Sequence, residues 1–199
     1  MRALAAIATA LLLVPQARAA PEEYTIDRSH TYPGFEVVHL GISTQRGRFD
    51  KTNGKIILDR EAGTGTLEIA IDTTSVSTGN SALDEALRGE DFFHVEKFPR
   101  MSFKSTHLEF DKGIPRRAMG ELTLLAETKP VTLQIEHFDC TQKPFLIRTT
   151  CGADVSTVIS RSAFGMSRWA VFIADKVKIV IQIEAYRVNA PPEPQPSGG

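Results

Sequence analysis

Residues 79–106 read GNSALDEALRGEDFFHVEKFPRMSFKST and predict a short helix, an aromatic turn and a strand, in that order. Asn80 or Ser81 supplies a side-chain oxygen that caps the first turn, and Gly89 ends the helix. Apolar residues at helical spacing give one face that must dock on the rest of the protein. That face consists of Ala82, Leu83, Ala86 and Leu87.

The turn that follows this helix is too aromatic for a solvated loop. If Phe92, Phe93 and Phe98 were exposed together, they would form an apolar patch that monomeric proteins rarely carry. We therefore expect these rings to rim or plug an apolar interior. After the turn, Met101 and Phe103 alternate with polar residues, which is the pattern of a strand with one buried face. The stretch predicts a helical lid that leads into a sheet.

The first 19 residues predict a secretory signal peptide. A basic start precedes an apolar run from Ala3 to Val14, and Ala17-Arg18-Ala19 is an A-x-A cleavage site. The run is shorter than the about 20 apolar residues that span a bilayer. We expect cleavage near Ala19, export to the periplasm, one domain over residues 20–188, and a disordered Pro-rich tail over residues 189–199.

The charge of the chain argues against a nucleic-acid partner. Cleavage removes two arginines, so the formal net charge changes from −1 to about −3. A mildly acidic chain without a basic block has little to attract a phosphate polymer.

The two cysteines, Cys140 and Cys151, predict a disulfide. In an oxidising compartment a lone pair of cysteines forms a bridge, and closing so short a loop stabilises a fold by ~3 kcal/mol. A metal-binding or redox pair is the alternative, but the spacing is not CxxC and no clustered histidines accompany it.

The sequence contains eight or nine stretches of alternating apolar and polar residues, which predict strands, and only one stretch that convincingly predicts a helix. Residues 67–71 form the clearest of them, while Gln45–Leu58 reads as one interrupted strand or two short ones, with a turn-forming Asn53-Gly54 in its middle. Helices are too few to cover such a sheet, so it closes on itself or packs on a second sheet. Short connections favour an all-β, extended antiparallel barrel of eight strands over a sandwich, with the helix at the barrel end.

An ordered set of short motifs runs through the chain. The motifs are Tyr24-Thr25-Ile26-Asp27, Ser29-His30-Thr31, His39-Leu40-Gly41, Arg46-Gly47-Arg48-Phe49, Gly79-Asn80, Leu87-Arg88, Asp91-Phe92-Phe93, Phe98-Pro99, Phe103-Lys104-Ser105-Thr106, Thr128-Lys129-Pro130-Val131-Thr132-Leu133 and Arg161-Ser162-Ala163-Phe164-Gly165-Met166. From Tyr24 to Ala185 the chain resembles the YceI-like family of exported polyisoprenoid-binding proteins. The resemblance implies a lipocalin-like barrel whose apolar pore holds a long lipid chain, with no catalytic centre and no cofactor. The cysteine pair, which only part of the family carries, and the Pro-rich tail depart from it.

The barrel interior has two interpretations. A pore lined by apolar side chains can hold a prenyl chain, since each CH₂ removed from water contributes about 0.8 kcal/mol. Alternatively, the same side chains fill the core, as they do in other small barrels. The resemblance favours the pore. The candidate ligand-binding residues are Phe35, Val37, Arg46, Phe49, Leu67, Ile69, Phe92, Met101, Phe103, Leu122, Leu133, Phe164 and Trp169.

A prenyl chain that ends in phosphate or pyrophosphate needs cationic or N–H donors at the mouth of the pore. Arg46 is the first candidate for this role. Arg48, Arg88, Arg161 and the helix N-terminus at Asn80 follow it. For each arginine, an ordinary surface or structural ion pair is the alternative.

The sequence predicts neither a metal site nor an enzyme. Its five histidines are scattered without HExxH or another ligand spacing, and His30 fits a hydrogen-bonded turn. There is no G-x-S-x-G elbow, so a hydrolase is the weaker alternative. The acidic pairs Asp84-Glu85 and Glu90-Asp91 are explained by the dipole of the helix and by solvation.

These observations predict a protein that binds a long-chain amphiphilic isoprenoid for transport, storage or a stress response. Because a quinone has the same kind of tail, the alternative is a periplasmic accessory that carries a quinone for an electron-transfer partner. A transient membrane-protein partner and a homodimer are further expectations.

Overall fold

The computed structural model describes residues 20–142 and 148–188, which form a closed antiparallel barrel of eight strands. This confirms the predicted architecture. The predicted signal peptide and the predicted tail lie outside the described residues.

Three of the eight barrel strands are interrupted, so the chain contains eleven strand segments. β1 and β2 form one composite strand, β3 and β4 the next, and β5 and β6 the third, because β1 pairs with β4, β2 with β3, and β3 with β6. The segments are β1 (Glu22–Ile26), β2 (Tyr32–His39), β3 (Ser43–Phe49), β4 (Thr52–Asp59), β5 (Thr64–Asp72), β6 (Val76–Ser77), β7 (Arg100–Asp111), β8 (Ile114–Leu124), β9 (Glu127–Thr141), β10 (Thr150–Ser160) and β11 (Ile173–Arg187).

The last strand closes the barrel. β11 pairs with β10 on one side, and on the other it pairs with both β1 and β2. Between β1 and β2 the Thr31 hydroxyl replaces missing ladder bonds, because it donates to the carbonyl of Glu184 and accepts from its N–H, both at 3.0 Å. The barrel is therefore continuous where the first composite strand bends.

Alternation along the strands separates an apolar interior from a polar exterior. In β9, Val131, Leu133 and Ile135 are partly buried, and the residues between them are exposed. Asn53-Gly54 does not form the expected turn, since both residues lie within β4, opposite Ala70 and Ile69. Gly54 occupies an inward position where a Cβ atom would come within 2.6 Å of Ile69 Cδ1, so close packing explains this glycine.

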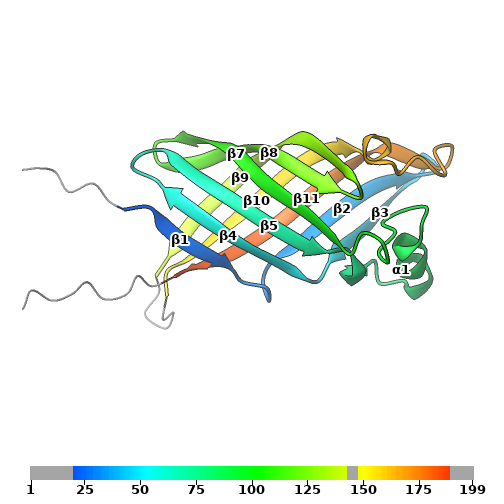
Figure 1. Cartoon of the computed structure of the whole chain (residues 1–199), viewed down its shortest axis with the longest axis horizontal. Helices are drawn as coiled ribbons and strands as arrows, with labels where there is room; N and C mark the ends of the chain where they lie inside the picture. Colours follow the sequence, from blue (N-terminus) through cyan, green and yellow to red (C-terminus); the bar gives the residue numbers. More distant parts are fainter. Residues whose placement is uncertain (1–19, 143–147, 189–199) are drawn as a thin grey trace, which may run out of the picture.

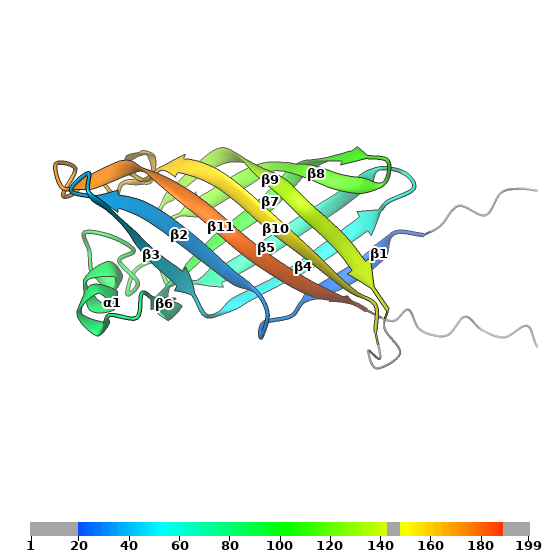
Figure 2. The ribbon, with the colours of Figure 1, turned by 180° about the vertical axis from the view of Figure 1, so that it is seen from behind.

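The two ends of the barrel are built differently (Figures 1 and 2). One end, called the lid end, carries α1 (Ser81–Arg88), the 3₁₀ turn η2 (Arg161–Phe164) and the turn between β2 and β3. A second 3₁₀ turn, η1 (Thr73–Ser75), separates β5 from β6. The other end, called the disulfide end, carries the β4–β5 and β7–β8 turns and both termini of the described barrel.

The helix of the lid end forms where it was predicted. The Asn80 side chain accepts hydrogen bonds from the N–H groups of Ala82 and Leu83, and Gly89 follows the last turn. Leu87 is buried and Leu83 packs partly against the core, whereas Ala82 and Ala86 are exposed. Two leucines, one turn apart, therefore make the docking face, which is narrower than the predicted one.

Candidate functional site: an apolar cavity along the barrel axis

A cavity of about 220 Å³ lies inside the barrel, and its lining residues come from both ends. Leu58, Phe138 and Cys151 line it at the disulfide end, and Leu87 and Met166 line it at the lid end. For comparison, an engineered apolar cavity of about 150 Å³ stays dry and binds benzene. The cavity is thus large enough for an organic ligand and extends along the barrel.

Residues in the middle of the barrel retain accessible surface although their side chains point inward. Leu67, Ile69, Leu133 and Ile179 line the cavity and are only partly buried. In a filled core, inward side chains of this kind would pack against one another and lose almost all of their accessible surface. Their exposure therefore faces internal space, and the filled-core interpretation does not describe this barrel.

The structure brings together ten of the thirteen side chains predicted to bind ligand. Those that line the cavity are Phe35, Val37, Phe49, Leu67, Ile69, Phe92, Met101, Phe103, Leu122 and Leu133. The other three lie elsewhere. Phe164 is fully packed in the lid-end core, Trp169 is half-exposed and donates to Asp91 at 3.2 Å, and Arg46 lies on the outer surface.

The aromatic turn after α1 lines the lid end of the cavity with two of the three rings that the sequence predicts to rim or plug the interior. Phe92 and Phe93 are lining residues, and the Phe93 ring meets that of Phe49 edge-on at 5.2 Å. Phe35 joins them, with its centroid 6.5 Å from that of Phe93. Phe98 is not a lining residue and instead packs against His94.

Polar side chains are few along the cavity, and one of them has no partner. The Thr52 hydroxyl is the buried side-chain polar atom that lacks a hydrogen bond within residues 20–142 and 148–188. Thr52 lies in the interval where the ladder of the first two composite strands is interrupted, between the pairs Thr25–Lys55 and Gly34–Arg48. A buried hydroxyl without a partner costs about 1–3 kcal/mol, so this atom is suited to a ligand oxygen or to water.

Arg161 lines the lid end of the cavity and is 4% exposed. Its guanidinium donates to four backbone carbonyls, with Nε bonding Ala174 at 3.1 Å, Nη2 bonding Ile173 at 3.0 Å, and Nη1 bonding Met166 and Arg168. Five N–H donors in a planar fork make arginine suited to holding several carbonyls at once. Arg161 therefore fixes the loop between η2 and β11, and four of its five donors are already used.

The other predicted head-group arginines lie outside the cavity. Arg46 pairs with Glu36 at 2.8 Å, and this hydrogen bond lowers the pKa of Glu36. Arg48 pairs with Asp50 and lies over the Tyr32 ring. Arg88 donates to two carbonyls beside α1.

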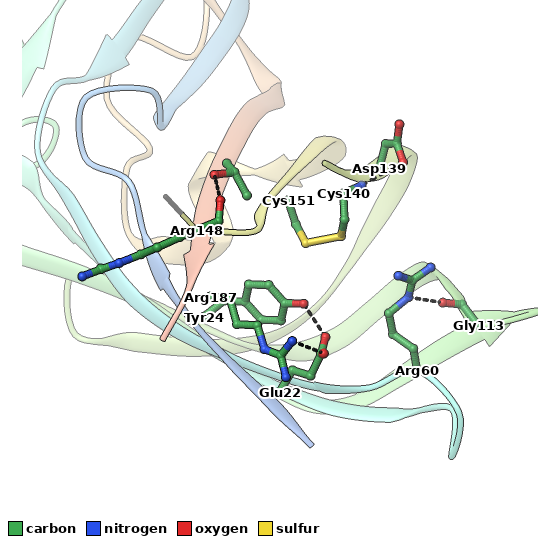
Figure 3. Close-up of a disulfide and its surroundings, with 10 residues drawn as sticks. Glu22, Tyr24, Arg60, Gly113, Asp139, Cys140, Arg148, Cys151 and Arg187 are labelled. Carbon is green, nitrogen blue, oxygen red and sulfur yellow. Dashed lines mark hydrogen bonds and ion pairs between the residues drawn. A yellow bond between two sulfur atoms is a disulfide. The ribbon is translucent and has the colours of Figure 1, made fainter. Parts of the chain in front are cut away.

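At the disulfide end, Cys140 and Cys151 form the predicted bridge between directly opposed residues of β9 and β10 (Figure 3). Tyr24 is 2% exposed beneath it and donates to Glu22 at 2.5 Å, while Arg187 pairs with the same carboxylate at 2.9 Å. Burial, together with the hydrogen bond to Glu22, raises the pKa of Tyr24 to about 12. This end is therefore held by a covalent link and by paired polar groups.

One surface cluster contains residue types that occur in hydrolases and metal sites. Ligand atoms of Asp27, His30 and Glu184 lie within 4.8 Å of one another, and Ser29 is hydrogen-bonded to Asp27. However, His30 Nδ1 faces both Asp27 (3.0 Å) and Ser29 (3.3 Å), whereas a catalytic triad needs the two partners on different ring nitrogens. The bonds within the cluster describe a hydrogen-bonded turn between β1 and β2.

Comparison with known proteins agrees with this architecture. The YceI-like domain matches residues 24–185. The chain belongs to the YceI-like family. A UPF0312 protein from Pseudomonas aeruginosa is 29% identical over 189 residues, covering 94% of this chain and 98% of that protein. One from Yersinia pestis is 32% identical over 136 residues, covering 67% and 70%.

Solved structures share the fold of this YceI-like barrel. Burkholderia cenocepacia BcnA superposes with a TM-score of 0.69 at 20% identity, covering 80% of this chain and 98% of that one. The Campylobacter jejuni YCEI protein gives 0.65 at 24% identity, covering 76% and 90%. A polyisoprenoid binding domain from Saccharophagus degradans gives 0.59 at 14% identity, covering 83% and 98%.

Sequence reasoning missed two features of the YceI-like cavity. Nothing near Thr52 distinguishes it from the other threonines of the chain, because its isolation depends on the bend between β3 and β4. The sequence offers Arg161 as a head-group candidate, but its carbonyl partners come together only when the loop after η2 is folded. Within the described ranges, no helix is long and apolar enough to cross a membrane.

Proposed function

We propose that this protein binds one extended isoprenoid lipid inside its barrel, without catalysing a reaction on it. The observation that carries the proposal is the apolar cavity that extends from the disulfide end to the lid end. The likeness in fold to a polyisoprenoid binding domain supports an isoprenoid over other lipids. In this proposal the protein works in the periplasm and carries or stores the lipid.

The binding energy comes from the tail of the lipid. Each CH₂ transferred from water contributes about 0.8 kcal/mol, so a few isoprene units suffice for tight binding. The cavity wall is almost entirely apolar. Its polar side chains are those of Tyr24, Thr31, Thr52, Thr157 and Arg161.

A ligand oxygen would pair with Thr52. Thr52 is 1% exposed and its hydroxyl has no partner within residues 20–142 and 148–188, so a ligand that supplies one hydrogen bond there removes a desolvation cost. Alcohols, phosphates and quinones all carry such oxygens. The proposal therefore includes the quinone-carrying accessory as a variant of the same binding site.

The test is to block the cavity from one strand. Ile179 of β11 lines the cavity, whereas Val158 on neighbouring β10 is 59% exposed on the outer face. Ile179→Trp should weaken the binding of a long-chain polyprenol by tenfold or more, measured by native mass spectrometry on delipidated protein. Val158→Trp, the matched control, should bind as the wild type does. If a correctly folded Ile179→Trp variant binds the polyprenol with unchanged affinity, the ligand lies outside the barrel and the proposal is wrong.

A further inference from the structure

Exposed apolar side chains are concentrated at the lid end. Eight large hydrophobic residues are exposed among those the structure describes, and six of them lie in two loops or, for Val38, at the end of the strand that leads into one of them. These six, called the apolar crest, are Val38 (42%), Leu40 (50%), Ile42 (83%), Trp169 (50%), Val171 (89%) and Phe172 (47%). A monomer rarely exposes so many large apolar groups at one place unless they contact something.

We propose that the apolar crest inserts into the surface of a lipid bilayer and brings the lid end of the cavity to the membrane. This inference rests on the proposed function, because a bilayer is where a long isoprenoid tail resides when it is not in the barrel.

The crest is a fixed structure in which two loops meet. The Leu40 N–H donates to the Phe172 carbonyl at 2.6 Å, and His39 pairs with Ile173 in the ladder. Leu40 and Trp169 both have positive φ angles, 55° and 61°, which are unfavourable for bulky residues. The backbone therefore tolerates local strain at two positions whose side chains are displayed to the outside.

The crest adjoins the cavity along both loops. Val37 lines the cavity and Val38 is exposed, while Ile173 lines the cavity and Phe172 before it is exposed. Arg161 bonds the carbonyls of Arg168 and Ile173, which flank the crest residues of the second loop. In both segments a cavity-lining residue is therefore the direct neighbour of a crest residue. A lipid that leaves the membrane at the crest would reach the cavity lining at once.

The composition of the two loops fits a bilayer better than a protein groove. Residues 37–49 and 161–174 contain no Asp or Glu, so insertion dehydrates no carboxylate of these loops themselves. The carboxylate that contacts the crest is that of Asp91, which accepts from Trp169 and pairs with Arg168. Arg46 and Arg168 are each 67% exposed behind the tips of the loops. Their long side chains can reach lipid phosphates there, and each arginine would then exchange its exposed carboxylate partner for a phosphate. Trp169 suits the interfacial region, since an indole is apolar with one N–H donor.

The experiment uses Trp169 as the reporter, because it is the only tryptophan of the chain. Vesicles of phosphatidylethanolamine and phosphatidylglycerol should shift its emission to the blue, and brominated acyl chains should quench it. The double variant Ile42→Ser/Val171→Ser should partition into the vesicles at least tenfold more weakly. Val188→Ser, at the opposite end and 39% exposed, should partition as the wild type does.

Three outcomes would overturn the proposal. They are a Trp169 spectrum that vesicles leave unchanged, a crest variant that partitions normally, and a blue shift that follows protein concentration without vesicles. The last would assign the crest to a second copy of the chain.

Failure of the proposed function is recognised separately. If Ile179→Trp abolishes polyprenol binding but the variant still floats with vesicles, both proposals stand. If the wild type floats with vesicles but binds no polyprenol, the proposed function is wrong and only the insertion of the crest into the bilayer stands.

Discussion

The two ends of the barrel are held together by different means. At the disulfide end, Cys140 and Cys151 link neighbouring strands covalently, and Tyr24 and Arg187 share the carboxylate of Glu22. At the lid end, a two-turn helix docks through two leucines, and non-covalent bonds hold the loop after η2, the buried ones being those from Arg161 to backbone carbonyls. One end is secured by a covalent link, and the other by hydrogen bonds and packing alone.

The unequal ends indicate where the barrel opens. Lids and ligand-binding loops generally belong to the parts of a structure that open at lower free energy than the rest, and the lid end has no covalent link across its strands. The lid end also displays the apolar crest, whereas Val188 is the exposed large apolar residue near the other end of the described barrel. We therefore expect the lipid to pass through the lid end, and the following changes test how unequal the ends are.

The largest effect is expected from Arg161→Met. The substitution leaves four backbone carbonyls without their donors, which should lower the free energy of unfolding by about 3 kcal/mol or more. Urea unfolding measures the change. Arg168→Met, which removes an exposed ion pair with Asp91, is the matched control and should cost less than about 1 kcal/mol. Equal effects of the two substitutions would show that Arg161 does not hold the lid end.

The next effect concerns the opposite end. Replacing both cysteines by serine should lower the free energy of unfolding by roughly 2–3 kcal/mol, because the bridge restricts the unfolded chain. Reduction of the wild type should give the same shift in the urea midpoint.

Release of bound polyprenol should accelerate more in Arg161→Met than in the serine variant. The opposite order would place the exit at the disulfide end.

Thr52→Val tests the unpaired hydroxyl between the ends. Removing it should stabilise the ligand-free protein by about 1 kcal/mol, since an unsatisfied buried polar group is lost without a change of shape. The same variant should bind an oxygen-bearing isoprenoid more weakly than a plain hydrocarbon of equal length, relative to the wild type. Thr66→Val, at an exposed site on β5, is the control for the change of residue type. A destabilised ligand-free Thr52→Val variant would contradict this account.

The smallest effect is a pH dependence at the lid end. Hydrogen bonds from Ser160 and Ser162 lower the pKa of Asp175 from 3.8 to about 2. The native carboxylate is therefore stabilising above pH 3.8, and this contribution is lost as the pH falls through about 2. The difference in melting temperature between the wild type and Asp175→Asn should shrink between pH 4 and pH 2. A difference that stays constant over this range would show that the carboxylate does not stabilise the start of η2.

The sequence predicts the barrel wall well because alternation is local. Residues such as Leu67, Ile69 and Leu133 face inward from the period of their own strands, and the helix after Asn80 is encoded by its cap. Phe164 and Trp169 could not be placed in this way, since they lie in a turn and a loop where no period assigns a side. For Arg46 and Arg161 the sequence leaves a head-group contact and a structural ion pair both open, and only the folded chain distinguishes the surface ion pair of Arg46 from the buried carbonyl bonds of Arg161.

In the proposed function, the open interior of the barrel takes one long apolar chain. Native mass spectrometry of the gently purified protein, before and after incubation with a long-chain polyprenol, tests it most directly. We expect a complex of one protein and one lipid, whose released ligand fragments by regular losses of isoprene units. A protein that stays ligand-free in both samples while correctly folded would contradict it.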